Sequence, residues 1–115
     1  LSDIPIHLIT QNPHQKYSPE SAYFSVSKGY GSLDSLSIER SQFENLNAIP
    51  LAVFKERRDE IDLAIITDVF CGDEICPIGD QYKSYYYDDD HLSSYGALKL
   101  TGIIERFFER SGDNR

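Results

Sequence analysis

The sequence lacks long apolar runs and has few basic residues. No apolar stretch approaches the roughly 20 residues that a helix needs to cross a bilayer, and no signal-peptide pattern opens the chain. Eleven basic residues stand against nineteen acidic ones, which gives a formal net charge of -8. A chain this acidic is unsuited to the phosphates of nucleic acids or anionic lipids. We therefore expect no nucleic-acid partner, and we expect any export signal or membrane anchor to lie outside these residues.

Length and composition predict one folded domain. With 115 residues the chain can enclose a single hydrophobic core but not two. Hydrophobic residues make up 40% and charged residues 26% of the chain, which is typical of globular proteins rather than of disordered ones.

Only two cysteines are present, Cys71 and Cys76. Their closeness in the sequence favours a local disulfide, which would close a small loop and stabilise the fold by about 2 kcal/mol. Such a bond would indicate an oxidising compartment. Two reduced thiols and a metal-binding pair remain alternatives, although two sulfurs alone fall short of a structural zinc site.

Two apolar segments predict strands of a parallel sheet. Apolar residues alternate over residues 4–9, and a continuous apolar run over residues 63–66 is typical of a strand that helices cover on both faces. The tyrosines at 85–87 form a third, short segment that favours β-structure. A sheet of two or three strands leaves an edge unprotected, so we expect part of the fold to be absent from this chain.

The segments around these strands predict loops and helices. Residues 15–33 are expected to form a loop with at most one helical turn, because glycines and serines break every period. Helices are expected over 35–47 and 51–59, with Pro50 interrupting them. Residues 70–80 read as an irregular loop.

Past the tyrosines, the chain turns helical again. Ser93 or Ser94 is a suitable N-cap for a last amphipathic helix, and Gly112 is a suitable end. The order of elements predicts an α/β domain.

The candidate chemistry lies in the turn just before that last helix, at Asp88 and His91. A histidine that acts as a general base needs a carboxylate on its far nitrogen to fix the tautomer. An aspartate three residues upstream can reach that nitrogen if the chain makes one tight turn, and it would raise the histidine pKa. A solvated acidic loop and a hard-cation site built on the carboxylates are the alternatives.

The segment YYYDDDHLSSYGA, residues 85–97, resembles the closing block of SGNH-hydrolase-like domains, in which a DxxH pattern supplies the aspartate and histidine of a catalytic triad. Together with the two cysteines, it is more narrowly similar to the SGNH domain fused to membrane-bound acyltransferase-3 proteins. Those proteins O-acetylate bacterial surface polysaccharides such as lipopolysaccharide O-antigen. The resemblance implies a three-layer α/β/α (flavodoxin-like) fold with a parallel sheet, of which this chain holds the C-terminal portion.

The resemblance also implies roles for individual residues. Asp88 would be the orienting acid, His91 the base, and Cys71–Cys76 a disulfide of the periplasm, in a periplasmic domain of a bacterial inner-membrane protein. Acetyl-CoA would be the ultimate acyl donor, used by an upstream membrane domain, and a polysaccharide hydroxyl the acceptor. No metal or cofactor is expected within these residues. Tyr85, Tyr87 and His14 are candidates for contacting the sugar, because aromatic rings pack well on apolar sugar faces.

The chain departs from the family pattern at the nucleophile. The Gly-Asp-Ser block, and the glycine and asparagine that complete the oxyanion hole, are not recognisable, and we expect them upstream of Leu1. This chain alone would be inactive, because it has a base without a nucleophile. Two alternatives remain open: a carbohydrate esterase of the same fold, and a non-catalytic glycan-binding or interaction module.

Overall fold

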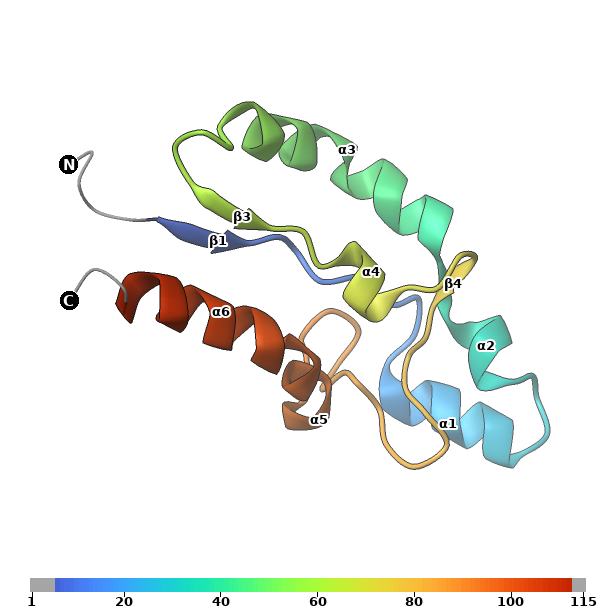
Figure 1. The fold of residues 1–115 in the computed structure, drawn as a ribbon. Helices are drawn as coiled ribbons and strands as arrows, with labels where there is room; N and C mark the ends of the chain where they lie inside the picture. The colour runs from blue at the N-terminus through green and yellow to red at the C-terminus, as the bar shows by residue number, and fades with distance from the viewer. Residues whose placement is uncertain (1–5, 113–115) are drawn as a thin grey trace.

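A parallel pair of strands forms the centre of the structure, a computed structural model that describes residues 6–112. Strand β1 (His7–Ile9) pairs in parallel with β3 (Asp62–Ala64), with Leu8 opposite Leu63. Figure 1 shows the two strands side by side between helices α3 and α6. The predicted parallel pairing is thus confirmed, and the described residues form a small α/β unit with a two-stranded parallel sheet.

Both strands are shorter than the apolar runs that predicted them. Ile6 precedes β1 and is exposed, while Ile4 lies outside the described residues. After β3 the backbone leaves the sheet, and Ile66 is buried in the turn that precedes helix α4 (Thr67–Phe70). The Ile66 N–H donates to Thr10 Oγ1 across 3.0 Å, so this turn is attached to the segment that follows β1.

For residues 15–33 the sequence predicts a loop with one helical turn after Pro19-Glu20; a helix does begin at Pro19, but α1 (Pro19–Ser27) is longer than one turn. Ser18 caps the helix by accepting from the Ser21 N–H, and a proline at the first helical position suits the fixed φ of its ring. Only Pro19 and Ala22 of the helix are buried, so its apolar face is too narrow to show a helical period.

The predicted helix break at Pro50 is wrong. A short α2 (Leu33–Leu36) and strand β2 (Ile38–Glu39) precede a single helix α3 (Arg40–Glu56), which runs through the proline. Proline removes one backbone hydrogen bond, but Pro50 is exposed, so water can satisfy the carbonyl that loses its partner.

The expected loop over residues 70–80 contains the disulfide and one short strand. Cys71 and Cys76 are bonded, with Cα atoms 3.9 Å apart. Cys76 lies in strand β4 (Ile75–Cys76), which pairs antiparallel with β2 and places Cys76 opposite Ile38. The predicted disulfide is therefore present, and neither free thiols nor a metal pair describes these cysteines.

The tyrosine segment forms isolated bridges rather than the predicted strand. Tyr86 pairs with Leu92 in a single antiparallel bridge, which closes the turn between them. Beyond it, Ser93 caps helix α5 (Ser94–Ala97) by accepting from the Gly96 N–H, as predicted. A 3-10 turn, η1 (Leu98–Leu100), continues into α6 (Thr101–Gly112).

Two buried clusters make up the core. The larger lies around the disulfide and the start of α3, and contains Ile38, Phe43, Ile66, Phe70, Cys71 and Cys76. The smaller consists of Ala22, Ile78 and Tyr86. Leu92 packs against both clusters, so it joins them next to His91. None of the helices within residues 6–112 is long and apolar enough to cross a membrane.

Candidate active site

A tight turn brings the predicted aspartate and histidine together. The Tyr87 N–H donates to the His91 carbonyl across 2.7 Å and closes the turn at its base. Inside it, Asp88 Oδ1 accepts from the N–H groups of Asp90, at 3.0 Å, and His91, at 2.7 Å. Aspartate commonly caps a turn in this way, so the turn itself fixes the carboxylate.

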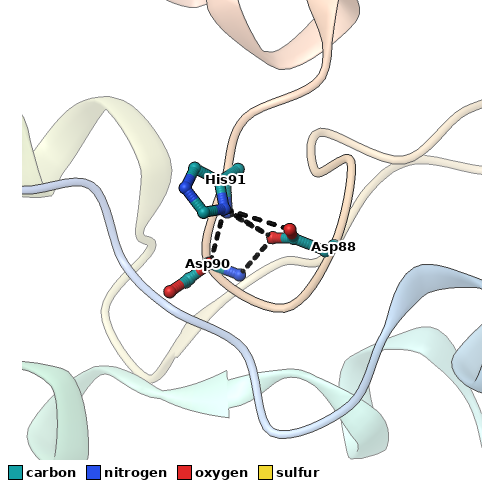
Figure 2. Close-up of side chains that lie close together, drawn as sticks. All are labelled: Asp88, Asp90 and His91. Atoms are coloured by element: carbon teal, nitrogen blue, oxygen red, sulfur yellow. Dashed lines mark hydrogen bonds and ion pairs between the residues drawn. The ribbon is translucent and has the colours of Figure 1, made fainter.

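The imidazole lies directly against this carboxylate (Figure 2). His91 Nδ1 is 3.0 Å from Asp88 Oδ2 and 3.1 Å from Asp88 Oδ1, and Asp90 Oδ1 is 2.7 Å from the same nitrogen. Ionised carboxylates only accept hydrogen bonds, so Nδ1 must carry a proton. In the neutral ring the lone pair is then on Nε2, which faces away from both carboxylates (Figure 2). This is the tautomer that a general base requires.

The contacts shift the pKa of both groups in opposite directions. Hydrogen bonds from the backbone N–H groups of Asp90 and His91, followed by the imidazole, lower the pKa of Asp88 to about 2. The hydrogen bond that the imidazole donates to Asp88 raises the pKa of His91, and the charges of Asp88 and Asp90 add to the effect. At neutral pH Asp88 is therefore ionised, and His91 takes up a proton more readily than a free histidine does.

The turn lies beyond the carboxyl end of β1. Asn12, three residues past that strand, donates from Nδ2 to the Asp90 carbonyl across 3.0 Å. Open α/β sheets place their ligand sites beyond the carboxyl ends of parallel strands. Asp88 and His91 thus occupy the end of the sheet where a site is expected.

A second histidine–aspartate pair lies at the opposite end of the sheet. His7 Nδ1 is 3.1 Å from Asp62 Oδ2, in adjacent strand positions, and the ring packs on Phe107 of α6 at 4.6 Å between centroids. Both residues open their strands, so this pair is at the amino ends. His7 thus packs between the sheet and α6.

The same turn could hold a cation. Ligand atoms of Asp88, Asp90 and His91 lie within 4.8 Å of one another. Hard cations such as calcium take six to eight oxygens, whereas this group offers two carboxylates and one nitrogen. These three side chains therefore suit a histidine oriented by carboxylates better than they suit a calcium site.

The histidine lies on an open surface. Its side chain is 74% exposed. A cavity of about 420 Å³ lies elsewhere, between α3 and the segment from Ile65 to Asp68. The described residues therefore hold an imidazole against a carboxylate, but they form no enclosing wall beside the ring.

The three candidate sugar-binding residues have different surroundings. Tyr87 is 75% exposed and directly precedes Asp88. Tyr85 instead stacks on Tyr95 at 5.6 Å between centroids, with the Lys99 ammonium 4.3 Å from its ring centre. His14 packs edge-on towards Phe43 at 6.5 Å. Of the three, Tyr87 offers the most open ring beside the turn.

Sequence reasoning missed two residues that reach the turn, Asn12 and Gln15. The Gln15 N–H donates to the Asp89 carbonyl, and the Asn12 amide to that of Asp90. In the sequence they read as turn and loop residues. The one signal that could have singled them out is their place just past a predicted parallel strand.

Comparison with known proteins gave one match. A family model described as "SGNH domain (fused to AT3 domains)" matches residues 1–106. No curated protein and no solved structure matches the chain significantly.

Proposed function

The chain belongs to the family of SGNH domains fused to AT3 domains, and from this premise we propose that it supplies the base and orienting acid of a serine-type O-acyltransferase. His91 is the base and Asp88 the acid. The acceptor is a carbohydrate hydroxyl of a surface polysaccharide, and the transferred group is acetyl.

One observation carries the proposal: His91 Nδ1 lies 3.0 Å from Asp88 Oδ2, with Nε2 facing away. The turn that creates this contact lies past the carboxyl end of β1, where α/β enzymes place their chemistry. A merely solvated acidic loop has no need of a carboxylate that is hydrogen-bonded to two backbone N–H groups and to the ring together.

In the first half of the proposed reaction, His91 Nε2 accepts the serine hydroxyl proton as the serine oxygen attacks the acetyl carbonyl. Asp88 stabilises the imidazolium that forms. The imidazolium then returns the proton to the leaving group as its bond to the acyl carbon breaks. The raised pKa of His91 suits these two proton transfers, because the ring must first accept the serine proton and then donate it to the leaving group.

In the second half, a sugar hydroxyl attacks the acetyl-serine. Nε2 accepts the sugar proton and returns a proton to the serine oxygen, which frees the enzyme. Tyr87, exposed next to the turn, is the ring best placed to pack on the sugar. Acetyl-CoA is the proposed ultimate donor, through the AT3 domain.

The serine and the oxyanion hole come, in this proposal, from a Gly-Asp-Ser block outside these 115 residues. That segment would also bring further strands, which extend the pair β1–β3 into the central sheet of a three-layer α/β/α fold. The open surface around His91 is consistent with a site that needs another segment to form its second wall.

We place the site in the periplasm. Fusion to AT3 domains suggests that the protein is anchored to a membrane. The Cys71–Cys76 bond supports an oxidising compartment on the outer side of that membrane.

The test is acetyl transfer by the whole protein carrying His91→Ala. We expect no measurable transfer to its polysaccharide and nearly unchanged thermal stability, because the ring is exposed. His7→Ala is the control for the loss of a histidine that lies at the opposite end of the sheet. Transfer at the normal rate in His91→Ala would remove His91 from the mechanism.

Hydrolysis is the second candidate, because the exposed ring gives water the same access as a sugar hydroxyl. The two reactions share every step except the acceptor. An acetylated polysaccharide that loses acetyl groups in the presence of the protein, with no transfer from a donor, would favour the esterase. A protein that binds the polysaccharide and does neither would favour a non-catalytic module.

A further inference from the structure

Three peptide planes connect Asp88 to His91, and the last two are each held at both of their ends. The N–H groups of Asp90 and His91 donate to Asp88 Oδ1. The carbonyls of the same two planes belong to Asp89 and Asp90, and both accept from the segment after β1. Gln15 N–H donates to the Asp89 carbonyl, and Asn12 Nδ2 donates to the Asp90 carbonyl across 3.0 Å.

The segment that provides these donors is itself anchored in the core. Gln15 is 3% exposed, and its side chain bridges β2 and β4: Nε2 donates to the Cys76 carbonyl at 2.8 Å, and Oε1 accepts from the Ile38 N–H at 2.9 Å. Pro13 is fully buried. The donors therefore hold the turn from a fixed support.

We infer that Asn12 is a positioning residue, which holds the peptide plane between Asp90 and His91 and thereby keeps the imidazole on the Asp88 carboxylate. A peptide plane rotates as a unit, so a hydrogen bond on its carbonyl also fixes the direction of its N–H. Without the Asn12 amide, the His91 N–H can turn away from Asp88 Oδ1. The carboxylate then loses one of the contacts that aim it at Nδ1.

The turn's own contacts do not replace this one. The bond from the Tyr87 N–H to the His91 carbonyl closes the base of the turn, on the far side of His91 from this plane. Asn12 also donates to its neighbour, the Pro13 carbonyl, at 3.0 Å, and this bond keeps the amide turned in one direction. Asn12 is thus preorganised as a donor towards the turn.

The geometric claim can be tested without any activity. Diethyl pyrocarbonate modifies only neutral imidazole, so the pH dependence of His91 modification, read by mass spectrometry of the whole protein, follows the ionisation of this ring. We expect Asn12→Ala to shift the His91 curve to lower pH, because the ring loses contact with Asp88 while Asp90 remains beside it. The curves of His7 and His14 should stay in place and report that the fold is retained.

Asn45→Ala is the matched control, since it removes the same amide from an exposed position on α3. An unshifted His91 curve in Asn12→Ala overturns the inference. Should the curves of all three histidines change, Asn12→Gln, which moves the donor by one methylene, takes the place of the alanine variant, and an unshifted His91 curve there overturns it equally.

The kinetic consequence rests on the proposed function. In the whole protein, we expect Asn12→Ala to lower kcat for acetyl transfer about tenfold with KM little changed, because a slightly misplaced catalytic group slows the chemical step. A shifted His91 curve with unaltered kcat would keep the positioning role of Asn12 and refute His91 as the base. Reduced kcat with an unshifted curve would instead refute the positioning role.

Discussion

Two helical glycines should respond in opposite ways to the same added methyl group. A Cβ on Gly96, in α5, would lie 1.9 Å from the Tyr85 carbonyl oxygen and 2.7 Å from its carbonyl carbon. These are backbone atoms, so the helix or the tyrosine segment must move. At Gly102, in α6, no atom lies within 4 Å of the added Cβ.

The two effects can be estimated separately. Alanine in place of a helical glycine gains about 1 kcal/mol of helix propensity. At Gly96, overpacking costs about 3 kcal/mol, including strain on the 3.0 Å bond from the Ser93 N–H to the Tyr85 carbonyl. We expect Gly96→Ala to lower the free energy of unfolding by about 2 kcal/mol and Tm by about 8 °C, and Gly102→Ala to raise Tm by about 4 °C.

Thermal unfolding of the purified variants, followed by circular dichroism, measures both changes. Because α5 follows the turn of Asp88 and His91, the proposed function predicts that Gly96→Ala also slows acetyl transfer, whereas Gly102→Ala does not. If the Gly96→Ala variant were as stable as the Gly102→Ala variant, the close packing of α5 on the tyrosine segment would be refuted.

Other variants test the electrostatics and the disulfide. Asp88→Asn should shift the rising limb of the pH–rate profile to lower pH, because His91 loses the contact that raises its pKa. It should also slow transfer roughly a thousandfold or more. An unmoved limb would exclude an Asp88–His91 pair, and Asp89→Asn, at an exposed position, is the matched control. The stability that Asp88 contributes is complete above its usual pKa of 3.8 and is lost as the pH falls through about 2. Tm should therefore fall less steeply with acid in Asp88→Asn than in the wild type, and equal slopes would contradict the lowered pKa. The disulfide between Cys71 and Cys76, five positions apart, should contribute about 2 kcal/mol to the free energy of unfolding. Urea unfolding of the variant with both cysteines changed to serine measures this contribution. A free thiol in denatured, unreduced protein would contradict the bond.

Segments with one strong local signal were predictable from the sequence. The run at residues 63–66 indicated a buried strand in a parallel sheet, and β3 pairs in parallel with β1. The Ser93 cap and the apolar spacing behind it located the last helices. The turn of Asp88 and His91 could also be anticipated, because both partners lie three residues apart and one turn is enough to join them.

Elements that depend on tertiary contacts were not predictable. Helix α1 buries only Pro19 and Ala22, so its sequence carries almost no periodic signal. Pro50 is tolerated because its side of α3 is exposed, which the sequence does not reveal. The bond from Asn12 to Asp90 spans 78 positions. Such a contact depends on where the strands and loops pack, and no local pattern encodes it.

The residue after the histidine gives the site a mechanical coupling. Leu92 inserts its side chain between the two apolar clusters, one beside the disulfide and one beneath the tyrosines. Any rearrangement on either side that moves this leucine also moves the backbone of His91, because a peptide bond joins the two residues. If His91 is the base we propose, substitutions deep in the interior, far from any surface that a sugar could touch, should therefore alter the rate of transfer.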